Sequence, residues 1–184
     1  MRNLADHLFD ILENSVKAGA TEVKITLGIQ DNLFFCKIED NGMGIKEKNV
    51  TDPFVTSRKT RKVGLGLPFL KKAVEGTGGF LRIFNLNKRG ACLEFKTDIS
   101  HIDAKPFGDI ARTFVDAIYS WPDVDFEIFT NIENNKKIPV LNSRKIKNIV
   151  NQSEMQQKEI RDFIYQSIDQ ELKKIGIDTQ FGIL

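Results

Sequence analysis

Three polar side chains near the N-terminus have the types and spacing to act on a bound phosphate. Asp10 and Asn14 are four residues apart, and Lys17 follows three residues later. In a helix this spacing puts a carboxylate, an amide and an ammonium group on one face. Such a row can position a water molecule, ligate a hard cation and contact a phosphate. The alternative is that these residues form only the solvated side of an amphipathic helix.

The segment DNGMG, at residues 40–44, is a second candidate site because it follows a strand-like run. Asp40 can accept a hydrogen bond from an exocyclic amine. Gly42 and Gly44 have no side chain, so the backbone there can approach a flat ring closely. The alternative is an ordinary turn, since Asp-Asn-Gly is a common turn sequence. The ligand spacing of an EF-hand calcium loop is absent.

A third candidate is the segment GLGL at residues 64–67, directly before a helical pattern. The free amides and dipole of a helix start favour a phosphate, although the Lys-Ser/Thr pair of a Walker loop is missing. The preceding stretch, residues 46–62, holds six basic and two acidic side chains. Its length exceeds that of most connections and indicates a lid over a ligand. The alternative is an exposed loop that charge keeps in solution.

Periodicity predicts the elements that must position these groups. Apolar residues recur every three or four positions in the helices, and they alternate with polar residues in the strands. The predicted helices are 3–18, 67–76, 107–121 and 153–175. The predicted strands are 22–29, 33–40, 79–86, 91–99 and 123–132. Residues 133–152 are polar and rich in Asn and Lys, which favours a loop or a short helix. In the last helix, Ile160, Phe163, Ile164, Ile168 and Leu172 are expected to share one apolar face.

Composition indicates an ordinary globular protein. The chain has 184 residues, of which 41% are hydrophobic, and its net charge is +2. No run approaches the roughly 20 apolar residues of a membrane span. Cys36 and Cys92 lack metal-ligand spacing, and the acidic N-terminus is not a secretory signal. We therefore expect a cytoplasmic protein without a membrane or nucleic-acid partner. The basic run at residues 136–147 is expected to be a solvated linker, because no aromatic residues interrupt it.

In this order, the three motifs resemble those of the GHKL ATP-binding superfamily, which includes gyrase-type topoisomerases, heat-shock chaperones, histidine kinases and mismatch-repair proteins. The segment DILENSVKAGATEVKI (10–25) is similar to the N box, and IEDNGMGI (38–45) to the first glycine box. The segment 52–79 is similar to the lid and second glycine box of histidine kinases. The resemblance implies an α+β, two-layer α/β sandwich, the Bergerat fold. Its mixed, mostly antiparallel sheet of about five strands would carry helices 3–18, 67–76 and 107–121 on one face. The ATP-binding domain would span residues 1–135, and residues 136–184 would form a basic linker and an amphipathic helix.

The resemblance also implies roles for individual residues. Asp40 would bind the adenine amino group, with Gly42 and Gly44 beside the base. Asn14 would ligate Mg²⁺, and Lys17 would contact a phosphate. The phosphate-binding amides would be those of Gly64, Leu65, Gly66 and Leu67, with weaker lid contacts from Thr56, Ser57 and Lys59.

Asp10 occupies the position at which relatives commonly place the glutamate that polarises the attacking water. Its side chain is one methylene shorter, and a displacement of about 1 Å can cost on the order of 100-fold in rate. The resemblance therefore implies a protein that binds Mg-ATP under a mobile lid, hydrolyses it slowly and couples hydrolysis to a protein partner. Two alternatives stay open: a serine or histidine protein kinase of the anti-sigma-factor type, and a non-catalytic nucleotide sensor. A homodimer is also left open.

Overall fold

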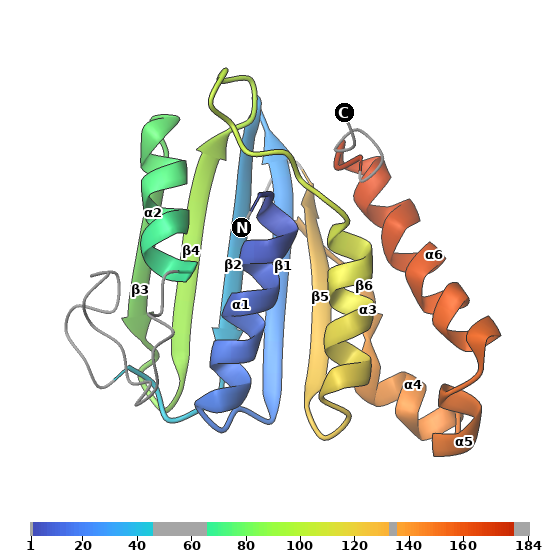
Figure 1. Ribbon diagram of the computed structural model, residues 1–184. Coiled ribbons are helices and arrows are strands. Elements are labelled where there is room, and N and C mark those ends of the chain that lie inside the picture. The colour runs from blue at the N-terminus through green and yellow to red at the C-terminus, as the bar shows by residue number, and fades with distance from the viewer. Residues whose placement is uncertain (1, 46–65, 133–135, 179–184) are drawn as a thin grey trace.

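The computed structural model describes residues 2–45, 66–132 and 136–178, which form one layer of helices over one mixed sheet (Figure 1). The strands are β1 (Glu22–Gln30), β2 (Leu33–Asp40), β3 (Phe80–Asn85), β4 (Ala91–Asp98), β5 (Asp125–Ile132) and β6 (Lys136–Asn142). Their order across the sheet is β3-β4-β2-β1-β5-β6. Only the β1–β5 pair is parallel among the strand pairs of this described sheet. The predicted α+β two-layer class is confirmed.

The helical layer lies on one side of the sheet. Its members are α1 (Leu4–Lys17), α2 (Gly66–Gly76), α3 (Ile110–Ser120) and α6 (Lys158–Lys174). Two short helices, α4 (Ser143–Ile149) and α5 (Gln152–Met155), connect the edge strand β6 to α6. Figure 1 shows α1, α2 and α3 across the front of the sheet, with α6 beyond α3. The predicted placement of the first three helices on one face therefore agrees with the structure.

The core fills the space between this layer and the sheet. Alternate residues of β1, such as Ile25 and Leu27, are fully buried, and so are Leu8 and Leu12 of α1. The periods of 2.0 in the strand and 3.6 in the helix put these side chains into the same layer. Since α1 buries its apolar stripe here, Asp6, Asp10 and Glu13 are left on the outer side of the helix, where they line a groove shared with α3.

Two helix predictions needed correction at their boundaries. The third helix begins at Ile110 rather than at residue 107, because Asp109 caps it by accepting a hydrogen bond from the Arg112 amide. The predicted helix 153–175 is two helices, α5 and α6, and α5 is opened by a capping box between Asn151 and Glu154. The expected apolar face is wrong at Phe163, whose exposed fraction is 66%.

The sixth strand, β6, falls where the sequence favoured a loop or a short helix. The prediction of a short helix in residues 133–152 is confirmed by α4, but the prediction of a loop is wrong for the residues that form β6. β6 is an edge strand that begins with two exposed lysines, contains Pro139 and departs from regular register against β5. Such features protect an edge from further pairing, but they hide its alternating pattern. Because β5 and β6 pair across the proposed boundary at residue 135, the expected linker contains a strand of the same sheet.

Gly90 brings the β3–β4 hairpin against the end of β2. Its φ is +96°, and a Cβ atom there would lie 1.7 Å from the carbonyl oxygen of Asp40. Glycine is the residue that tolerates both this left-handed conformation and the close approach. The hairpin therefore packs directly against the backbone of Asp40 and Asn41.

We expect Gly90→Ala to lower the free energy of unfolding by at least about 2 kcal/mol, because the added methyl group collides with backbone and the φ is strained. Chemical denaturation would measure the change. Gly76→Ala is the matched control, since nothing lies within 4 Å of its added Cβ. Equal stabilities of the two variants would contradict the proposed close approach.

His7 is the buried titratable side chain of α1, with an exposed fraction of 1%. Burial, followed by the nearby Lys105 ammonium, lowers the pKa of His7 from 6.5 to about 4. The unfolded chain therefore takes up a proton at a higher pH than the folded protein does. Acid should destabilise the fold through this residue.

Between pH 6.5 and pH 4, we expect His7 to reduce the free energy of unfolding by up to about 3 kcal/mol as pH falls. Denaturation curves at several pH values would show the slope. His7→Gln should flatten it, whereas replacement of the exposed His101 by Gln should not. Parallel pH profiles for the protein and the His7→Gln variant would refute this.

Candidate functional site

The Asp40 carboxylate is held in one orientation at the end of β2. The Ser15 hydroxyl donates to its Oδ2 at 3.0 Å. The amides of Gly42 and Ala91 donate to its Oδ1 at 2.9 and 3.3 Å. Three donors from α1, the glycine turn and β4 thus fix the direction in which a ligand amine would meet this acceptor.

Ser15 is a site residue that the sequence predictions missed. It is buried, although it belongs to the same helix as the polar row of Asp10, Asn14 and Lys17. Its position on the stripe of Leu8, Ile11 and Leu12 was the available signal, since a hydroxyl among core residues needs a hydrogen-bond partner.

The turn that follows Asp40 is clamped from three directions. The Met43 amide donates to the Ala18 carbonyl at 2.9 Å, and Arg89 Nε donates to the Gly42 carbonyl at 3.2 Å. Asn85 accepts from the Ile45 amide at 2.6 Å and donates to the Ile45 carbonyl at 3.1 Å. Asn85 and Arg89 were not predicted, because their partners lie 40 and 47 residues away in the chain.

Both predicted glycines of this turn are required by geometry. Gly44 has a φ of +75°, and a Cβ there would lie 2.7 Å from Asn85 Oδ1. A Cβ at Gly42 would lie 2.9 Å from the Ala18 carbonyl oxygen. The backbone can therefore form a flat wall beside Asp40 only with glycine at these positions.

The polar row on α1 is present as predicted. Asn14 Nδ2 lies 3.5 Å from Asp10 Oδ2, and Lys17 Nζ lies 2.5 Å from Glu13 Oε1. Half of the Lys17 side chain is exposed, so its ion pair with Glu13 is weak and readily exchanged. A phosphate could replace Glu13 as the partner of this ammonium group.

A groove of about 770 Å³ runs beside Asp10, between α1, α3 and α6. Asp116 and Arg161 form an ion pair of 2.6 Å on its far side, and the Arg161 guanidinium lies 4.9 Å from the Tyr119 ring centroid. The remaining lining residues are Ala5, Asp6, Phe9, Glu13, Thr113 and Ser120. Asp10 is thus reachable from the side of α1 that faces α3.

The donor set of α1 suits magnesium only with a ligand that brings oxygens of its own. In the described ranges, no group of three His, Cys, Asp or Glu residues could hold a metal ion. Mg²⁺ commonly takes one or two protein oxygens and completes its shell with phosphates and water. The amide oxygen of Asn14, with Asp10 beside it, fits that pattern.

The predicted phosphate-binding turn is described in part. Gly66 and Leu67 open α2, so their amides belong to its first turn, as the sequence implied. Gly64, Leu65 and the predicted lid residues Thr56, Ser57 and Lys59 lie outside the described residues.

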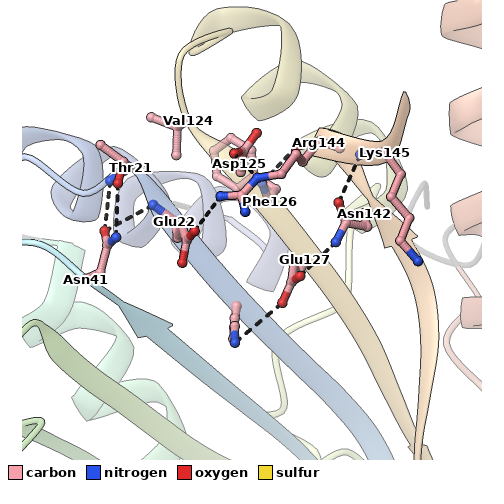
Figure 2. A network of polar contacts seen from close by, with 12 residues as sticks. Thr21, Glu22, Asn41, Val124, Asp125, Phe126, Glu127, Asn142, Arg144 and Lys145 are labelled. Carbon is pink, nitrogen blue, oxygen red and sulfur yellow. Dashed lines mark hydrogen bonds and ion pairs between the residues drawn. The ribbon is translucent and has the colours of Figure 1, made fainter. Parts of the chain in front are cut away.

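A polar network ties this edge of the sheet to the C-terminal part of the chain (Figure 2). Asn41 Oδ1 accepts from the amides of Thr21 and Glu22 at 2.8 and 3.0 Å. Arg144 of α4 pairs with Glu22 and, at 2.7 Å, with Asp125. These bonds, first to Asp125 and then to Glu22, raise the pKa of the Arg144 guanidinium. The turn after Asp40 and helix α4 are therefore both anchored at the start of β1, and α4 is also anchored at the start of β5.

None of the described helices is both long enough and apolar enough to cross a membrane.

Comparison with known proteins places this chain in a family. Over 87 residues the chain is 29% identical to an NtrY-like sensor histidine kinase of Rickettsia conorii, covering 46% of this chain and 14% of the relative. It is 34% identical over 94 residues to sporulation kinase D of Bacillus subtilis, covering 46% and 18%. The chain thus spans less than a fifth of the length of these curated relatives.

A solved structure, the N-terminal domain of a DNA repair protein, has the same fold. The superposition covers 84% of this chain and 59% of the chain of the DNA repair protein, with a TM-score of 0.54 and 13% sequence identity. Residues 2–101, more than half of the chain, match the family described as histidine kinase-, DNA gyrase B- and HSP90-like ATPases. The chain therefore belongs to the histidine kinase-, DNA gyrase B- and HSP90-like ATPase family, the GHKL superfamily.

Proposed function

We propose that this protein binds Mg-ATP at the site between α1, α2 and the glycine turn, hydrolyses it slowly and couples the nucleotide state to a protein partner. The observation that carries the proposal is the fixed Asp40 carboxylate. Its three donors come from groups that are separate in sequence, Ser15, Gly42 and Ala91, and they leave a defined approach for the adenine amino group.

The other parts of the nucleotide also have matching groups in the site. The glycine turn supplies a flat backbone wall for the base, and the first turn of α2 supplies amides for the phosphates. Asn14 and Lys17 supply the magnesium ligand and a phosphate contact. Binding of Mg-ATP would thus give a role to each of these polar groups, none of which contributes apolar contacts to the core.

Slow hydrolysis is proposed because of the side chain at position 10. Asp10 lies beside Asn14, and its carboxylate would polarise a water molecule next to the terminal phosphate. An aspartate reaches less far than a glutamate from the same backbone position, so the attacking water is held less well. The rate of hydrolysis would then depend on a nearby charge or on a small shift of α1. A protein partner could change the rate by supplying that charge or causing that shift.

The groove beside Asp10 favours one second candidate, a protein kinase. It is an open space of about 770 Å³ that reaches the proposed catalytic carboxylate from the side of α3 and α6. A serine or histidine of another protein could enter there and accept the phosphoryl group in place of water. Phosphate recovered on a partner, rather than in solution, would decide for this candidate.

Replacement of Asp40 by Asn should weaken ATP binding by about 1–3 kcal/mol, because the charge-assisted bond to the adenine amine is lost. Titration calorimetry with Mg²⁺ would measure the affinity. Asp98→Asn is the matched control: Asp98 also accepts hydrogen bonds from a nearby serine, Ser100, but lies at the opposite end of β4. ATP affinity that is unaffected by Asp40→Asn would remove the assignment of the adenine contact.

Replacement of Asp10 by Glu should raise the rate of phosphate release, by as much as about 100-fold if reach is the limiting factor. Asp10→Asn should reduce release below that of the unchanged protein while ATP still binds. Phosphate release under single-turnover conditions is the measurement, with ATP affinity of each variant as the control. A rate insensitive to both substitutions would show that Asp10 has no part in hydrolysis and would favour a nucleotide sensor.

A further inference from the structure

His7 is a buried side chain whose polar atoms are used neither by the core nor by the proposed hydrolysis. Both ring nitrogens are inaccessible to solvent, and neither makes a hydrogen bond of regular geometry among the residues that the structure describes, although the ring faces the Gly66 backbone. Buried polar groups are nearly always hydrogen-bonded, so each exception needs a physical explanation. A neutral imidazole carries one donor and one acceptor, and here neither has a well-formed bond.

The location of His7 relates it to the phosphate end of the site. It precedes Asp10 by three residues and Asn14 by seven, so the three side chains share one side of α1 over about 10 Å. The imidazole lies beside the backbone of Gly66, the first residue of α2. Helices α1 and α2 contact each other. His7, a residue of α1, therefore lies beside the start of α2, whose first-turn amides are proposed to bind phosphates.

The first turn of α1 keeps the imidazole in this position. The amides of Leu4 and Ala5 donate to the carbonyls of Pro106 and Phe107, each at 2.9 Å. Burial keeps the ring uncharged, since it lowers the pKa of His7 to about 4. The ring thus has one N–H to donate near neutral pH, and the anchored helix prevents it from turning to solvent.

Gly66 is the group that such a donor can restrain. A glycine has wide conformational freedom, so the peptide units at the start of α2 need an external contact to hold their direction. Amide direction decides whether a helix start can bind an anion. A hydrogen bond to the Gly66 carbonyl from a buried, fixed ring would supply that restraint.

We propose that His7 is a positioning residue for the nucleotide phosphates: when ADP or ATP is bound, its imidazole N–H donates to the Gly66 carbonyl and orients the first turn of α2. The inference rests on the proposed function for the identity of the ligand. It adds a residue outside the predicted site and a link between α1 and the phosphate-binding turn.

Nitrogen-15 NMR of the imidazole groups tests this in the unchanged protein. The chain has two histidines, so His101, which is exposed, serves as an internal reference, and His101→Gln assigns the two signals. Titration with ADP and Mg²⁺ should shift the His7 nitrogens and produce an N–H proton that exchanges slowly with water. His7 signals that stay unchanged at saturating ADP would overturn the proposal.

Variants give an independent readout. His7→Leu should weaken ADP binding about fivefold to tenfold, the effect of one hydrogen bond, and leave AMP binding within about twofold. His7→Gln retains an amide donor and should recover much of the ADP affinity. Ile11→Val controls for loss of packing in α1 and should bind both nucleotides like the unchanged protein. Equal losses for AMP and ADP in His7→Leu, or none, would overturn the phosphate-positioning role.

The two proposals fail in different ways. No ADP binding by the unchanged protein would overturn both of them. ADP binding that depends on Asp40, combined with a His7 spectrum that ADP does not alter, would overturn only the role of His7.

Discussion

The rotation of α1 about its own axis is the constraint on which the site depends. Leu8 and Leu12 are buried in the core, and this burial determines which residues of the helix face the sheet. With that rotation, the Ser15 hydroxyl meets Asp40, while Asp10 and Asn14 face outward together. One residue of slippage would rotate every side chain by about 100°, which would take Ser15 away from Asp40 and turn the Asp10–Asn14 pair toward another face. The hydrophobic stripe of α1 is thus as important for the site as the polar groups themselves.

Close backbone approach shapes the site around Asp40. Gly90 lies against the Asp40 carbonyl, and Gly42 and Gly44 leave room for Ala18 and Asn85. Side chains then act as clamps on main-chain atoms instead of lining a deep cavity. A pocket wall made of backbone has little freedom to adjust, which suits recognition of a flat, rigid ring.

The C-terminal part of the chain borders the same site on two sides. Arg144 of α4 pairs with Glu22, whose amide is held by Asn41 of the glycine turn. On the other side, Arg161 of α6 pairs with Asp116 across the groove beside Asp10. Neither ion pair is deeply buried, so each contributes modestly to stability. Their main effect is to hold α4 against the start of β1 and α6 against α3, beside the proposed site.

The sequence by itself determined the elements with strong periodicity and the order of the motifs. The stripe of α1, the strands that became β1 and β2, and the position of Asp40 at a strand end all follow from local pattern. Only the tertiary structure decided that Ser15, Asn85 and Arg89 belong to the site, that β6 extends the sheet and that Phe163 is exposed. The physical reason is that hydrogen bonds over 25 to 47 residues and the pairing of a charged edge strand depend on packing between distant segments. Local propensity carries no information about that packing.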